Sequence, residues 1–210
     1  MSTHVALLGD SIFDNGTYTK GEPDVVAHLR SLLPNTWQAT LLAIDGSVCA
    51  DLRSQLARVR DETHLVISAG GNDAILSSGL MHVPVSSTAE ALALFGARME
   101  EFEAEYRSAI DAALVLKRKT TVCTIYNGNL SEQEAPLAKV GLMIFNDVIL
   151  RVAFERHLSV IDLRLVCCDP ADYANPIEPS GSGGRKIAQA ITRSLQLTNE
   201  GSICSHVYSG

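Results

Sequence analysis

Five short apolar runs alternate with longer amphipathic segments along the chain. The runs are rich in β-branched residues and are bounded by Gly, Asp or Asn, as expected of strands that are buried on both faces. They cover residues 5–8, 39–44, 65–68, 121–126 and 158–163. Strands that alternate with helices pair in parallel through right-handed crossovers. The pattern therefore predicts an α/β domain in which helices cover both faces of a five-stranded parallel sheet.

The segments between the runs have apolar residues at the three- and four-residue steps that are typical of helices. They predict helices over residues 23–33, 51–60, 88–116, 136–154 and 184–195. The longest carries one stripe, made of Phe95, Met99, Phe102, Tyr106, Ile110 and Ala113. Packing against the core explains this stripe better than a bound cofactor does. The helix over 136–154 repeats the pattern with Leu137, Val140, Ile144 and Val148.

Length and composition narrow the class of protein. The 210 residues suffice for one core, so we expect a single domain over residues 1–197 and a patternless tail over 198–210. The net charge of −7 argues against nucleic acid or an anionic membrane as a partner. No apolar run is long enough to span a membrane, and the first residues do not form a secretory signal. We therefore expect a cytoplasmic protein.

The five cysteines have neither disulfide nor zinc-site spacing.

Three polar, glycine-rich loops follow the first three predicted strands. They read GDS at residues 9–11, IDGS at 44–47 and GGND at 70–73. Because ligands of open parallel sheets bind beyond the carboxyl ends of the strands, these loops should meet at one site. Ser11 would expose its Oγ at the start of a helical turn, Gly46 would offer a bare N–H, and Asn72 would direct its amide inward. Together these groups predict a serine nucleophile with an oxyanion hole.

This combination resembles the SGNH, or GDSL-type, hydrolases, which are named for a Ser, a Gly, an Asn and a His. The chain matches the first three in order and spacing, with Ser11, Gly46 and Asn72. The resemblance implies a flavodoxin-like fold and hydrolysis of esters or thioesters, with no cofactor and no metal. Members of the family include esterases, lipases, thioesterases and carbohydrate deacetylases.

The fourth motif of that family, Asp-x-x-His-Pro, is altered in this chain. The matching stretch reads NPIEP at residues 175–179, with Asn175 in the Asp position and Glu178 in the His position. Burial can raise a carboxyl pKa by about 2 units, to near 6, so a buried glutamate can act as a general base. Asn175 is consistent with this exchange, because protonation of a carboxylate leaves no cation for an aspartate to stabilise.

The roles of several residues stay open at this point. Glu178 is a base or proton relay, a substrate-binding carboxylate or a structural residue. His82, in the loop after the third strand, is the alternative base on the same edge. Asp14 would orient the nucleophile loop or bind a polar substrate, whereas Asp10 and Asp73 would accept backbone hydrogen bonds in their turns.

The sequence favours a serine hydrolase acting on a small-molecule ester or thioester of a small acyl group. One alternative is a catalytically impaired binding protein that keeps the oxyanion pocket. A weaker alternative is a metal-assisted hydrolase that uses Asp10, Asp14 and Glu178. The sequence leaves the acyl length and the oligomeric state open.

Overall fold

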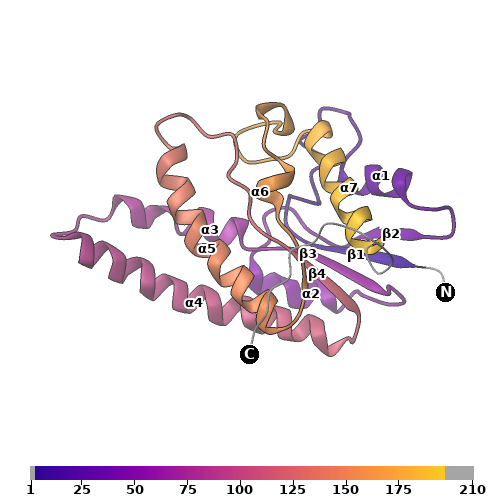
Figure 1. Ribbon diagram of the computed structural model, residues 1–210, viewed down its shortest axis with the longest axis horizontal. Coiled ribbons are helices and arrows are strands. Elements are labelled where there is room, and N and C mark those ends of the chain that lie inside the picture. Colours follow the sequence, from indigo (N-terminus) through magenta and orange to yellow (C-terminus); the bar gives the residue numbers. More distant parts are fainter. Residues whose placement is uncertain (1–2, 197–210) are drawn as a thin grey trace.

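The computed structural model describes residues 3–196, and their five strands form one parallel sheet (Figure 1). The strand order is β2-β1-β3-β4-β5. The strands are β1 (His4–Gly9), β2 (Gln38–Leu41), β3 (His64–Ser68), β4 (Lys119–Cys123) and β5 (Ser159–Ile161). The α/β class and the five-stranded parallel sheet are as the sequence predicts. The tail expected over residues 198–210 lies outside the described residues.

Helices cover both faces of the sheet and make three layers (Figure 1). One face carries α1 (Val25–Leu32) and α7 (Gly181–Gln196), and the other carries α2 (Leu52–Leu56), α4 (Thr88–Val115) and α5 (Ala135–Glu155). Alternate residues of β1 serve the two cores: Ala6 and Leu8 pack on the α4 side, and Val5 and Leu7 pack on the α1 side. No helix among residues 3–196 is both long and apolar enough to cross a bilayer.

Several short elements in the connections have no counterpart in the periodicity analysis. They are the helices α3 (Gly71–Leu76) and α6 (Leu163–Val166) and the 3-10 turns η1 (Cys49–Asp51), η2 (Ser78–His82) and η3 (Pro170–Asp172). Each is too short for a repeating apolar pattern to show. Two of them, α3 and η2, form the link from β3 to α4 at the carboxyl edge of the sheet.

Two predicted boundaries move for identifiable reasons. The second strand ends at Leu41, because the N–H groups of Leu42 and Ala43 both donate to the Leu7 carbonyl and the chain turns there. The last helix begins at Gly181, three residues before the predicted start. A Cβ on Gly183 would lie 2.1 Å from the Asp172 carbonyl oxygen, so glycine lets the first turn of α7 pack against η3.

The predicted stripe on α4 faces the core from Met99 onward. Phe95, its first member, is only half-buried and lies outside the core, so the prediction is wrong for this residue. The stripe on α5 behaves alike: Val148 is buried, whereas Leu137 and Val140 are exposed. Both helices therefore extend beyond the sheet that covers their later turns (Figure 1).

Candidate active site

The nucleophile loop begins at a glycine that no other residue can replace without rearrangement. Gly9, the last residue of β1, has a φ of +125°, and a Cβ there would lie 1.6 Å from the Ser68 carbonyl oxygen of β3. The buried side chain of Gln55 on α2 accepts the Gly9 N–H at 2.7 Å and donates to the Gly9 carbonyl at 2.8 Å. This amide fixes the direction in which the chain leaves the sheet.

Ser11 follows in a single helical turn. The N–H groups of Phe13 and Asp14 donate to the Asp10 carbonyl, and the Ile12 N–H donates to the Asp10 carboxylate at 3.1 Å. Ser11 is buried, and its Oγ donates a hydrogen bond to Glu178 Oε1 at 3.0 Å. The carboxylate therefore occupies the place where a serine nucleophile needs a proton acceptor.

Glu178 is held there by the loop between η3 and α7. Asn175 Oδ1 accepts the backbone N–H groups of Ile177 and Glu178, both at 2.9 Å. Asn15 Nδ2 donates to the Pro179 carbonyl at 3.1 Å, and the Tyr126 hydroxyl donates to the Ile177 carbonyl. Asn175 thus fixes the backbone that presents the Glu178 carboxylate.

Burial raises the pKa of Glu178 from its usual value to about 7. The hydrogen bond from Ser11 opposes this shift, and the negative charge of Asp45 adds to it. Glu178 Oε2 is buried and accepts no hydrogen bond from the described residues. A carboxyl of this kind exchanges a proton near neutral pH, as a histidine does.

Asp10 is a second buried carboxyl beside the nucleophile. Burial raises its pKa to about 7; the Ile12 N–H opposes the shift, and the charges of Glu178 and Asp73 add to it. The two carboxyls, Asp10 and Glu178, flank Ser11 in one poorly solvated region. The negative charge of Glu178 thus disfavours ionisation of Asp10.

Backbone and side-chain donors lie in the three loops that carry Ser11, Gly46 and Asn72. Within the described chain, neither the Ser11 N–H nor the Gly46 N–H has an intramolecular hydrogen-bond partner. Asn72 Nδ2 donates to the Ser47 carbonyl at 2.9 Å, which uses one of its two hydrogens and leaves the other free. Gln55 also donates to Ser47 Oγ, so one hydrogen-bond network connects all three loops. Donors of these kinds are the ones that stabilise an oxyanion in acyl-transfer enzymes.

Sequence comparison decides the family. The profile described as "GDSL-like Lipase/Acylhydrolase family" matches residues 7–186. The chain belongs to this family. The match runs from β1 into α7 and so includes the GDS loop and the loop of Glu178. Membership implies ester hydrolysis, which is the activity common to GDSL-like lipases and esterases. No curated protein sequence is significantly similar to the chain.

Solved structures of GDSL-like enzymes share the fold. An extracellular lipase from Streptomyces rimosus aligns with a TM-score of 0.67 and 16% identity, over 91% of this chain and 99% of its own. A phospholipase A1 from Streptomyces albidoflavus aligns with a TM-score of 0.70 and 14% identity, over 92% and 99%. An acetyl xylan esterase aligns with a TM-score of 0.67 and 16% identity, over 91% and 99%. At these identities the likeness shows the SGNH-type fold.

The remaining predicted residues differ in the contacts that they make. Asp73 is buried, and its Oδ2 accepts the Cys49 N–H at 3.1 Å, which ties α3 to η1. Asp14 Oδ2 accepts the Asp45 N–H at 3.0 Å and so holds the loop after β2. His82 is exposed at the end of η2, and its side chain forms no hydrogen bond with the described residues. The geometry at Ser11 favours Glu178 over His82 as the base.

Three supporting residues were missed by the sequence analysis. Gln55 and Asn15 are fully buried amides that hold the nucleophile loop and the Glu178 loop. Tyr18 donates to Asp45 Oδ2 at 2.6 Å, in the loop whose charge acts on Glu178. No periodicity or motif distinguishes them from surface polar residues. Buried polar side chains are identifiable only once the fold shows what they satisfy.

One group of potential metal ligands exists among residues 3–196, and it lies away from Ser11. His4, Asp61 and Glu62 bring their ligand atoms within 4.8 Å of one another. They lie at the start of β1 and just before β3, which is the amino edge of the sheet. Asp10, Asp14 and Glu178 form no such group, so their geometry does not support the metal-assisted alternative.

Proposed function

We propose that this protein is a serine hydrolase of carboxylic esters or thioesters, with Ser11 as the nucleophile and Glu178 as the general base. The observation that carries the proposal is the hydrogen bond from Ser11 Oγ to Glu178 Oε1 at 3.0 Å. Family membership supports the reaction class, and the donors around Ser11 support its mechanism. Asn-x-x-Glu would then replace the family's Asp-x-x-His as a working variant.

The proposed reaction has two halves. In the first, Ser11 Oγ attacks the ester carbonyl and its proton passes to Glu178. The oxyanion accepts hydrogen bonds from the Ser11 and Gly46 N–H groups and from Asn72. Glu178 then returns the proton to the leaving alcohol or thiol, and Ser11 holds the acyl group. In the second half, water attacks the acyl-enzyme and gives a proton to Glu178. The bond between the acyl carbon and Ser11 Oγ then breaks, Glu178 returns the proton to Ser11 Oγ, and the carboxylic acid is released.

The electrostatics explain how a glutamate can replace a histidine here. A free glutamate is about 2.2 pH units more acidic than a histidine, a deficit in proton affinity of about 3 kcal/mol. Burial offsets the whole of this deficit, because it raises the pKa of Glu178 to about 7. Glu178 becomes neutral when it takes the proton, so Asn175 has no cation to stabilise and serves as a backbone anchor.

The sequence suggests a small acyl group, and the similar structures do not decide this point. Their names include an acetyl xylan esterase and two lipolytic enzymes. Acyl size depends on the surfaces beyond Ser11 that contact the acyl chain.

The missing histidine favours one second candidate, a binding protein that keeps the oxyanion pocket without turnover. Hydrolysis of p-nitrophenyl acetate by the wild type and by Ser11→Ala separates the two. The proposal expects turnover by the wild type and background rate in the variant. Equal rates in the two proteins would remove Ser11 from the mechanism. Failure of the wild type to hydrolyse any member of an ester panel would favour the binding protein.

A further inference from the structure

The first turns of α4 and α5 carry apolar side chains that nothing in the described chain covers. Leu92 on α4 is 68% exposed, and Leu137 and Val140 on α5 are 61% and 59% exposed. Both helices become buried only in later turns, from Met99 and from Phe145. Contiguous exposed apolar patches are characteristic of interaction surfaces and ligand-binding grooves.

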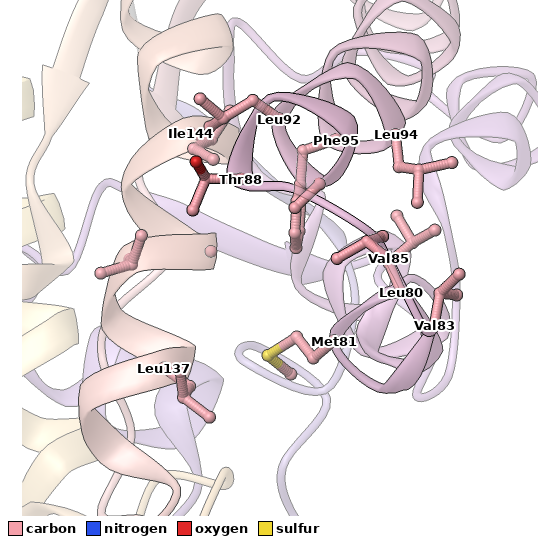
Figure 2. A pocket seen from close by; sticks show the side chains of 13 residues that line it. Leu80, Met81, Val83, Val85, Thr88, Leu92, Leu94, Phe95, Leu137 and Ile144 are labelled. Atoms are coloured by element: carbon pink, nitrogen blue, oxygen red, sulfur yellow. The ribbon is translucent and has the colours of Figure 1, made fainter.

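A groove of about 480 Å³ lies between these two helices and η2 (Figure 2). Its walls include Met81 of η2, Phe95 of α4 and Leu137 of α5. Thr88 has the one polar side chain among the thirteen lining residues, and no charged residue takes part. The volume falls within the roughly 300–1,000 Å³ of small-molecule sites, so the groove suits an apolar ligand of that size.

The groove adjoins the helix that contributes to the oxyanion site. Asn72 lies in the first turn of α3, and η2 begins two residues after α3 ends. At 1.5 Å per residue, the six residues of α3 span about 9 Å. Ile75 and Leu76, at the end of α3, are 47% and 76% exposed. Along the chain, these two residues are followed closely by Leu80 and Met81 of η2, which line the groove.

We infer that this groove binds the hydrocarbon chain of an acyl ester or thioester whose carbonyl is held at Ser11 and Asn72. The inference rests on the proposed function and replaces the small acyl group with a chain of medium length. The uncharged lining matches an alkyl chain, and burying each methylene favours binding. The net charge of −7 offers no attraction to an anionic lipid surface, which argues against membrane docking.

A series of p-nitrophenyl esters from acetate through butyrate to octanoate, kept below their micelle-forming concentrations, tests this inference. We expect kcat/KM to rise by about two- to fourfold per added methylene until the groove is filled. A groove variant, Leu137→Gln with Val140→Gln, should lower kcat/KM for octanoate at least about tenfold and leave acetate within about twofold.

The matched control makes the same substitutions outside the groove, at Leu165 and Val115, which are 79% and 76% exposed. Leu165→Gln with Val115→Gln should leave both esters within about twofold of wild type. Equal thermal unfolding temperatures of the two double variants show that any difference is local.

Four outcomes would overturn the inference. They are a chain-length series that is flat or falling, equal losses on acetate and octanoate in the groove variant, a wild-type dimer that the groove variant converts to monomer, and vesicle binding that the variant loses. The dimer would assign the groove to a second copy of the chain. In each of these cases acetate hydrolysis dependent on Ser11 would still stand. Absence of turnover on every ester would instead remove the proposed function and this inference together.

Discussion

Ser11 and Glu178 lie 167 positions apart in the sequence, and their side chains meet in a hydrogen bond of 3.0 Å. The serine hydroxyl donates and the glutamate accepts, as in the resting state of a nucleophile and its base. Asn175 and Asn15 form hydrogen bonds with the backbone of the loop that carries Glu178. These contacts position the Glu178 carboxylate beside Ser11. The proposed mechanism predicts consequences for activity, pH dependence and stability.

The activity should follow the ionisation of Glu178. Only the carboxylate accepts the proton of Ser11, and the pKa of Glu178 is raised to about 7. We therefore expect kcat/KM for p-nitrophenyl acetate to fall about tenfold per pH unit below an apparent pKa near 7. A rate independent of pH between about 5 and about 8 would contradict the assignment.

Asp45, in the loop after β2, should influence the pH at which the activity falls on the acid side of the pH–rate profile. Its charge raises the pKa of Glu178, so Asp45→Asn should shift the acid limb of kcat/KM toward lower pH. Asp61→Asn changes an exposed aspartate at the amino edge of the sheet and provides the matched control. A pH–rate profile of each variant measures the effect. Identical limbs in the two variants would show that Asp45 does not act on the base.

Asn72 should stabilise the transition state more than the bound substrate. Asn72→Ala is expected to lower kcat about 100- to 1000-fold with little change in KM, as removal of one oxyanion donor does. Steady-state kinetics with a soluble ester measure both constants. Because Asn72 also donates to the Ser47 carbonyl, the unfolding temperature of the variant must be measured beside its activity. A large rise in KM at constant kcat would instead indicate a substrate-binding role.

The buried carboxyl of Glu178 should make the free energy of unfolding depend on pH. The folded-state pKa of Glu178 lies above the value of 4.5 of an unperturbed glutamate, so the folded protein binds more protons than the unfolded chain between about pH 4.5 and about pH 7. Its free energy of unfolding therefore falls as pH rises through this window. Glu178→Gln removes this dependence of the unfolding free energy on pH. The unfolding free energy of the variant minus that of the wild type should therefore be larger at pH 8 than at pH 4, by on the order of 2 kcal/mol. Denaturant unfolding at the two pH values checks the sign.

Because Gly9 packs directly against the Ser68 carbonyl, substitution of Gly9 by a residue with a side chain should destabilise the protein. In Gly9→Ala the new Cβ would collide with the Ser68 carbonyl at a positive φ, and we expect a loss of at least about 3 kcal/mol in unfolding free energy. Gly79 has open space around it and an ordinary φ, so Gly79→Ala should change stability by less than about 1 kcal/mol. Similar losses in both variants would contradict the packing of β1 on β3.

The sequence predicts the sheet, the long helices and the three loops because their signals are local. A buried strand is an apolar run, and GDS and GGND place small residues and their donors in adjacent positions. The family resemblance sets the register of the fourth loop through Pro179. These features need no knowledge of which segments meet in space.

The supporting network and the groove could not be predicted, because they depend on long-range contacts. Gln55 holds Gly9 and Ser47 only after α2 packs beside β1. The stripes on α4 and α5 look continuous in the sequence, yet the sheet covers only their later turns. Periodicity indicates which face of a helix is apolar; it does not indicate how far the partner surface extends.

The rate at which a serine-directed phosphonate labels Ser11 tests the central claim most directly, because it measures nucleophilic attack without product release. At pH 8 the wild type should be labelled on Ser11, as intact mass and peptide mapping would show. Glu178→Gln keeps an oxygen that can accept the hydrogen bond from Ser11 and loses the base, so its labelling should be at least about 100-fold slower. Equal labelling rates in the two proteins would contradict the assignment of Glu178 as the base.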